Sequence, residues 1–209
     1  MSLRAPEKEE AMKRYIPGFF APIWGSPALI FLTALFVCGA AAGSFTGLLA
    51  ASNGSEQIVQ LADALAVRAG RAPNGMDAVL SALGAFGWQV SVLLAGWMRP
   101  SSLLLSLVCT VRGFTLSFSV STLLRALGMD GIWRSLAASG MAAVITVPCL
   151  LLTAAACFSA AQSAPRGQRG GYFYALGRYR GAVLGCTLAA VWAAVMQLPL
   201  GWMVERWIL

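Results

Sequence analysis

Five long stretches of this chain carry almost no charged residues, and this pattern limits the fold more than any other feature. The first runs from Ala28 to Ala51 without a charge, and about 20 apolar residues are enough to cross a bilayer as a helix. The other four lie at about 78–98, 101–124, 136–161 and 181–204. Because a spanning segment must satisfy its own backbone hydrogen bonds in lipid, each is expected to be helical. We therefore predict an all-α polytopic membrane protein, a bundle of about five transmembrane helices plus an outer amphipathic helix.

The composition is typical of a membrane protein and argues against metal sites, disulfides and enzymatic activity. Of the 209 residues, 58% are hydrophobic and 11% are charged, whereas a soluble domain carries about 25% charged residues. The chain has no His, which is the commonest general base and metal ligand. The five cysteines lie in apolar stretches and form no Cys-X-X-Cys pair, so neither a metal site nor a disulfide is expected. Since no activating base accompanies the Ser and Thr residues, we expect no enzymatic activity and no cofactor.

The chain is expected to hold a cytoplasmic tail, residues 1–26, and a single transmembrane domain, residues 27–209. A cleaved secretory signal is the alternative, because Ala40-Ala41-Ala42 would suit a small-residue cleavage site. The length of the polar tail favours a span that is retained. Residues 52–76 place apolar side chains on one helical face and charged ones elsewhere, which predicts an amphipathic segment on the outer membrane surface or on a partner.

The distribution of positive charge predicts how the chain is oriented. With five spans and a cytoplasmic amino end, nine of the 15 Lys and Arg residues fall on the inner side and five on the outer side, as the positive-inside rule requires. The connection at Arg99-Pro100 is short. If residues 78–98 only re-enter the membrane, the carboxyl end faces the cytoplasm instead. We expect a multi-pass protein of the cell membrane.

Two glycine ladders mark faces where helices can pack closely. Glycines recur at every fourth residue in the first span and again at the start of the fifth. This spacing places them on one helix face, where another backbone can approach. Packing within the chain is the favoured interpretation, and one form of it sets one ladder against the other; a groove for a partner helix is the alternative. The ladders are Gly39, Gly43 and Gly47, and Gly177, Gly181 and Gly185.

Arg112 lies near the middle of the third span, where a charge costs at least ~2.5–3.5 kcal/mol. No Asp or Glu falls within any span. Its partner is therefore expected to be a carbonyl group, a polar side chain such as Gln89 or Gln197, or a group on another chain. A role in packing inside the bundle and a functional role are both open for this arginine. The missing internal acid favours a partner molecule or an anionic headgroup.

The segment before the fifth span is basic, with Arg166, Arg169, Arg178 and Arg180. Such a segment attracts anionic membrane lipid, and its use as a topology anchor needs no further role. The neighbouring aromatic residues at 172–174 would suit RNA stacking. At the end of a span they are better interpreted as membrane-interface residues. We expect no binding of nucleic acid.

An ordered set of four short motifs resembles the pattern of one family of membrane proteins. Arg112-Gly113-Phe114 is similar to that family's basic residue and glycine inside a span, and Gly128-Met129-Asp130-Gly131 resembles its outer turn. Pro148 matches a proline in the fourth span, and Leu176-Gly177-Arg178-Tyr179 resembles the entry to the last span. On these motifs the chain resembles the stage II sporulation protein M family, over nearly all of residues 28–209, although most of the resemblance is hydrophobic pattern.

The chain departs from the family at two places. It has Met141-Ala142-Ala143 where members often carry a proline and a polar residue, and Ser117 where a glycine is common. Roles of those positions in the family do not carry over to this chain.

The resemblance implies a scaffold without chemistry of its own. Family members act with two single-pass partners whose outer domains degrade peptidoglycan, an amidase and a lytic transglycosylase. The complex works in the engulfing membrane of the mother cell during endospore formation. We expect the glycine ladders, Arg112-Gly113 and the Arg178-Tyr179 region to take part in assembly. The alternative is a permease or transporter subunit in which Arg112 contacts an anionic substrate or lipid. An intramembrane enzyme is a remote third option.

Overall fold

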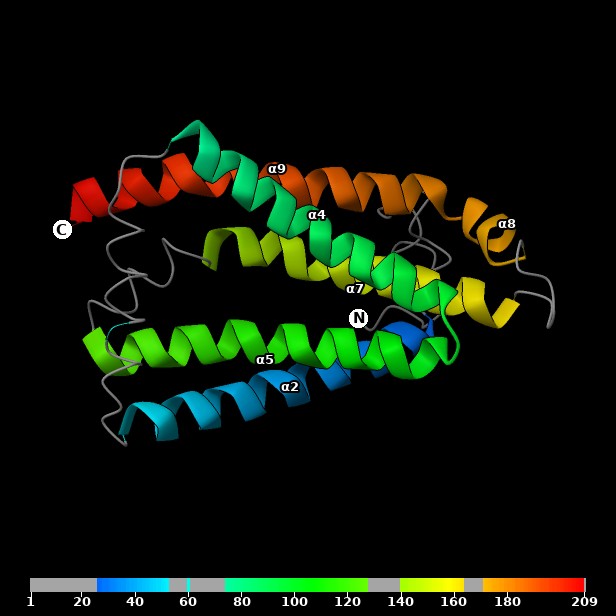
Figure 1. Cartoon of the computed structure of the whole chain (residues 1–209), viewed down its shortest axis with the longest axis horizontal. Coiled ribbons are helices and arrows are strands. Elements are labelled where there is room, and N and C mark those ends of the chain that lie inside the picture. The colour runs from blue at the N-terminus through cyan, green and yellow to red at the C-terminus, as the bar shows by residue number, and fades with distance from the viewer. Residues whose placement is uncertain (1–25, 53–59, 61–73, 128–139, 164–170, 209) are drawn as a thin grey trace, which may run out of the picture.

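The computed structural model describes residues 26–52, 60, 74–127, 140–163 and 171–208, and this part of the chain is all-α (Figure 1). Five of its helices are long and apolar enough to cross a membrane, which confirms the predicted polytopic helical fold. The tail, most of the predicted amphipathic segment 52–76 and the turn at 128–131 lie outside the described residues. The helices are α2 (Pro27–Ser52), α4 (Gly75–Trp97), α5 (Ser101–Leu127), α7 (Met141–Ser163), α8 (Gly171–Gly177) and α9 (Arg180–Ile208).

The start of α4 is fixed by a capping box. Asn74 is the N-cap residue, and its backbone N–H donates to Oδ2 of Asp77 at 3.4 Å. Because Asp77 satisfies this N–H group, the helix begins three residues before the position predicted from the sequence. Its 23 residues extend about 34 Å, more than the ~30 Å hydrocarbon core. The helix is therefore long enough for a complete crossing rather than a re-entrant turn.

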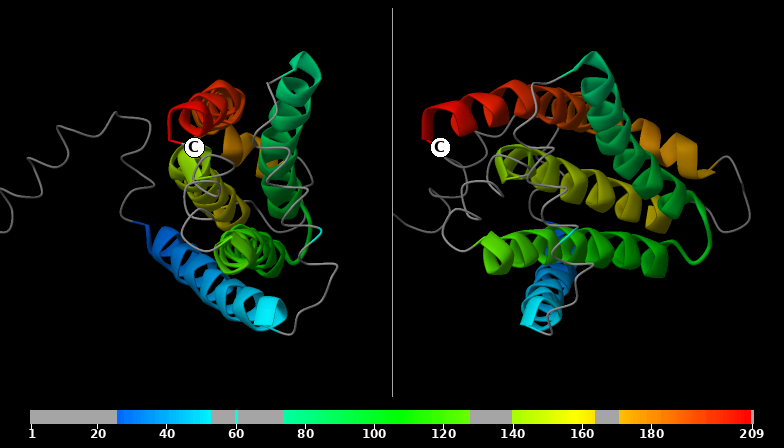
Figure 2. Two further views of the ribbon diagram at one scale, coloured as in Figure 1. Left: turned by 90° about the vertical axis from the view of Figure 1, so that its left-hand side faces the viewer. Right: turned by 60° about the vertical axis from the view of Figure 1, so that its left-hand side comes forward.

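Helix α7 lies at the centre of the bundle (Figures 1 and 2). It packs against every other described helix. Half of the residues in the most apolar 18-residue stretch of α7 are buried, compared with 17–22% in the corresponding stretches of the other spanning helices. Ala154, Ala155 and Ala156 point to different sides of α7 and are all completely buried, and these small side chains let several neighbours approach one helix. Helix α4 crosses α7 and α9 obliquely, and α2 lies along α5 (Figure 1).

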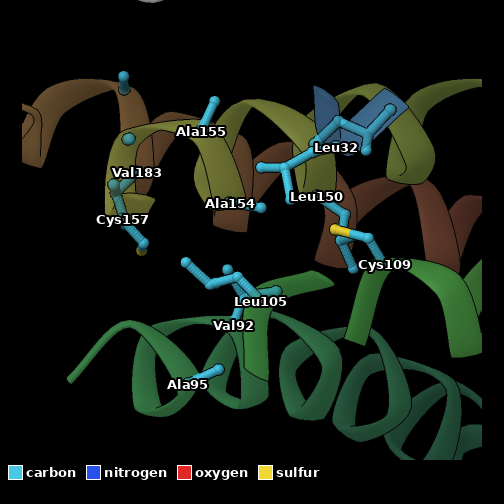
Figure 3. Close-up of a cluster of buried hydrophobic side chains, with 13 residues drawn as sticks. Leu32, Val92, Ala95, Leu105, Cys109, Leu150, Ala154, Ala155, Cys157 and Val183 are labelled. Atoms are coloured by element: carbon cyan, nitrogen blue, oxygen red, sulfur yellow. The ribbon is translucent and has the colours of Figure 1, made fainter. Parts of the chain in front are cut away.

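The hydrophobic core gathers side chains from all five spanning helices around α7 (Figure 3). Leu32 of α2, Val92 of α4 and Leu105 of α5 are completely buried there. Cys109 and Cys157 are also buried and free, where they act as small apolar side chains. The core thus fixes the relative positions of α2, α4, α5, α7 and α9, on which the features described next depend.

Candidate functional site

The first glycine ladder packs against α5 of the same chain. A Cβ atom added at Gly39 would overlap the carbonyl oxygen of Thr110, and one added at Gly43 would overlap that of Phe114. In the opposite direction, a Cβ at Gly113 would overlap the carbonyl oxygen of Phe36. The backbones of α2 and α5 therefore touch, and the contacts advance together along both helices, which run in the same direction.

The same interface continues through a serine pair. The hydroxyl groups of Ser44 and Ser117 are hydrogen-bonded to each other, and a Cβ added at Gly47 would come within 2.9 Å of Cβ of Ser121. This hydrogen bond is a polar link between the two helices. The first ladder and Gly113 are thus used inside the chain, and the predicted packing of one ladder on the other is wrong.

The second ladder is divided between two helices. Gly177 is the last residue of α8, and Gly181 lies at the start of α9. Between the helices is a turn in which the N–H of Tyr179 donates to the carbonyl of Leu176 at 2.8 Å. The three glycines therefore do not share one helical face as the spacing predicted. Arg178 is exposed in this turn, and Tyr179 packs against the core.

Helix α9 has an apolar stripe that faces away from the bundle. Leu184, Leu188 and Trp192 are 62%, 70% and 60% exposed. Gly181 and Gly185 lie on the same exposed side, and a Cβ added at Gly185 would meet no atom within 4 Å. We call these five residues the α9 stripe. In a bilayer this surface faces lipid or another helix.

Arg112 lies in a pocket formed by four of the spanning helices. Its guanidinium carbon is 4.8 Å from the centroid of the Trp88 ring, a distance at which a cation is attracted by the aromatic face. The pocket has a volume of about 250 Å³. Its lining consists of Ser81, Gly84, Ala85 and Trp88 of α4, Arg112 and Leu116 of α5, Ala142, Ala143 and Thr146 of α7, and Ala194, Gln197 and Leu198 of α9.

No carboxylate is among the twelve described residues that line this pocket. Arg112 thus brings a positive charge that this described lining does not neutralise. Of the two amides predicted as partners, Gln197 lines the pocket. Gln89 is buried one helical turn beyond Ala85, and its Oε1 has no hydrogen-bond partner among the described residues. The described residues contain no group of three or more His, Cys, Asp or Glu side chains suited to a metal ion.

No known protein family, curated protein or solved structure matches this chain. The α9 stripe and the Arg112 pocket are therefore the two candidate functional features of the described structure.

Two contacts do not follow from the sequence pattern. The first is the contact of Trp88 with Arg112 in the pocket, although an aromatic ring is a common partner of a cation. The second, at Tyr172, lies outside both the pocket and the α9 stripe. Tyr172 was interpreted as a membrane-interface residue, yet it is 5% exposed, and its hydroxyl donates to the carbonyl of Leu93 at 3.2 Å. Burial raises the pKa of Tyr172, so the phenol stays protonated and able to donate. This bond holds α8 beside the end of α4.

Proposed function

We propose that this protein is a non-enzymatic membrane scaffold that recruits single-pass membrane proteins with peptidoglycan-degrading outer domains. The observation that carries the proposal is the α9 stripe, an apolar, glycine-containing surface along a spanning helix that the bundle leaves uncovered. The resemblance to the stage II sporulation protein M family supplies the class of partner, an amidase and a lytic transglycosylase. It also supplies the setting, the engulfing membrane of the mother cell during endospore formation.

The α2–α5 interface shows how a glycine face works in this protein. There, Gly39 and Gly43 let the α5 backbone come into direct contact with α2. In lipid, apolar side chains gain little by leaving their surroundings, so helices associate where small residues allow close van der Waals contact. Gly181 and Gly185 offer the same opportunity on α9, while no helix of the described bundle occupies it. A partner's transmembrane helix is the ligand that this surface fits.

Co-purification from the native membrane tests the proposal. We expect the tagged protein to recover a single-pass protein with a peptidoglycan hydrolase domain, and Gly185→Leu to reduce that recovery roughly tenfold, as expected for losing about 1.4 kcal/mol of helix contact. Gly87→Leu is the matched control, because Gly87 is also an exposed helical glycine whose added Cβ meets no atom within 4 Å. Recovery of no such hydrolase, or equal loss in both variants, would contradict the scaffold function.

A transporter subunit for a small anion is the second candidate, and the Arg112 pocket is the observation that favours it. A cation near the middle of a span, with polar side chains from other helices around it, is typical of substrate sites in transporters. Uptake of anions into proteoliposomes measures this function directly. We expect flux to fall when the pocket is filled by Gly84→Leu, and flux that is unchanged by this substitution would exclude the pocket as the route.

A further inference from the structure

We propose that the Arg112 pocket binds a phosphate oxyanion, supplied by the headgroup of an anionic phospholipid. This inference concerns a different surface from the α9 stripe and does not depend on the scaffold function. It starts from the charge of Arg112, because an ionised side chain at this depth is expensive unless it is paired. Among its described lining residues, the pocket provides no carboxylate to pair with it.

Trp88 stabilises the cation without satisfying its hydrogen bonds. The ring attracts the guanidinium group, whose carbon lies 4.8 Å from the ring centroid. An indole has one N–H donor and no acceptor, whereas a guanidinium has five N–H donors. Attraction to the ring therefore leaves donors of Arg112 that require acceptor oxygens. Arginine matches the oxygens of phosphate in a bidentate manner.

The other polar lining residues suit a ligand with several oxygen atoms. Ser81 of α4 and Thr146 of α7 carry hydroxyl groups, and Gln197 of α9 carries an amide. Together with Arg112 they place a polar side chain on each of the four helices around the pocket. Its volume of about 250 Å³ is several times the ~30 Å³ share of one water molecule. The phosphate part of a lipid headgroup fits this space and the donors of Arg112, Ser81 and Thr146.

The position of the pocket favours a lipid as the source of the phosphate. Gly84 lines the pocket and is also exposed on the outside of the bundle. Its exposed apolar neighbours on α4 are Leu80, Leu83 and Phe86, and the side chains of Leu80 and Leu83 are 50% and 58% exposed. Apolar surface of α4 therefore borders the lining, as needed for acyl chains to lie against the protein. Ala142, near the beginning of α7, is also in the lining. The pocket thus extends from mid-span toward one end of the helices, where headgroups are found.

Native mass spectrometry of the purified full chain tests this inference. The protein is exchanged into detergent with equal amounts of phosphatidylglycerol and phosphatidylcholine, and lipid retention is compared. We expect wild type to retain phosphatidylglycerol preferentially and Arg112→Gln to lose roughly tenfold or more of that retention, as for one charge-assisted hydrogen bond. Equal retention of the two lipids by wild type, or the same phosphatidylglycerol retention in Arg112→Gln, would overturn the proposal.

A pair of glycine variants distinguishes loss of the binding site from misfolding of the protein. Gly84→Leu fills the pocket while keeping Arg112, and Gly87→Leu adds the same side chain to the same helix outside the lining. A Cβ at either position meets no atom within 4 Å, so both variants are expected to fold. We expect Gly84→Leu alone to lose phosphatidylglycerol. Equal loss in both variants, or retention by both, would refute the pocket as the binding site.

Two further measurements separate the sources of the anion and the two proposals. Displacement of bound lipid by inorganic phosphate would support the oxyanion site with the free ion as a source. If Gly84→Leu loses the partner protein while retaining the lipid, the site instead receives a carboxylate of a partner helix, and the lipid proposal fails. Gly185→Leu, by contrast, is expected to lose the partner and keep the lipid, because the α9 stripe lies outside the pocket lining.

Discussion

Replacing Gly43 by alanine tests whether the first glycine ladder holds the bundle together. The added methyl group would overlap the carbonyl oxygen of Phe114. A backbone atom cannot rotate away as a side chain can, so α2 must move off α5 to relieve the overlap. We expect Gly43→Ala to destabilise the folded protein without preventing its insertion into the membrane.

The magnitude follows from comparison with a glycine in open surroundings. Adding a methyl group to a filled interface costs about 1–3 kcal/mol, while alanine in place of glycine recovers up to ~1 kcal/mol of helix propensity. Gly87→Ala makes the same chemical change where the added Cβ meets no atom within 4 Å. The propensity gain therefore cancels between the two variants. We expect the free energy of unfolding of Gly43→Ala to be about 1–3 kcal/mol lower than that of Gly87→Ala.

Thermal unfolding in one detergent, followed by circular dichroism, measures this difference. For a chain of this length the expected gap in Tm is roughly 2–12 °C. Gly113→Ala, which overlaps Phe36 across the same interface, should cost less in a Gly43→Ala background than alone, because α2 has already moved. Equal Tm values for Gly43→Ala and Gly87→Ala would refute direct contact between the two backbones.

Three other substitutions test separate parts of the structure. Gln89→Leu should leave Tm unchanged or raise it, because it removes a buried acceptor that has no partner in the described part of the chain, a burial cost of ~1–3 kcal/mol. A large fall in Tm would show that Oε1 is paired. Tyr172→Phe should lower the free energy of unfolding by ~1 kcal/mol, because the hydrogen bond to the carbonyl of Leu93 is lost. An unchanged free energy of unfolding would show that this hydrogen bond does not stabilise the fold. In a cysteine-free background, Met76→Cys should react with an impermeant maleimide from outside, whereas Arg99→Cys should react only after permeabilisation. External labelling of Arg99→Cys would reverse the proposed orientation.

The helices were predictable because lipid leaves a spanning chain few alternatives. An apolar segment in hydrocarbon must form its own hydrogen bonds, so hydropathy alone located α2, α4, α5 and α9 to within a few residues. The start of α4 differed because Asn74 and Asp77 extend the helix into polar sequence. Capping depends on particular side chains and is averaged out in a hydropathy window.

The neighbours of each helix were not predictable in the same way. Spacing placed Gly39, Gly43 and Gly47 on one face, but the identity of the facing helix, α5, depends on packing between segments about 70 residues apart. Likewise, Trp88 and Gln89 are adjacent in sequence and point about 100° apart on a helix. Only the rotation of α4 in the bundle decides that the ring, rather than the amide, meets Arg112. Rotation of this kind is set by tertiary contacts that one sequence does not display.

The central position of α7 has a consequence for how the protein is made. Helix α7 is the fourth of the five spanning helices in chain order, yet it touches all the others. Helices that insert one by one before they associate must therefore wait for α7 before the bundle can close. Before α7 is inserted, α2 and α5 can already pack against each other, because their backbone contact needs no third helix. Biogenesis is thus expected to pass through an early α2–α5 pair, with α4 held at its side until α7 leaves the insertion machinery.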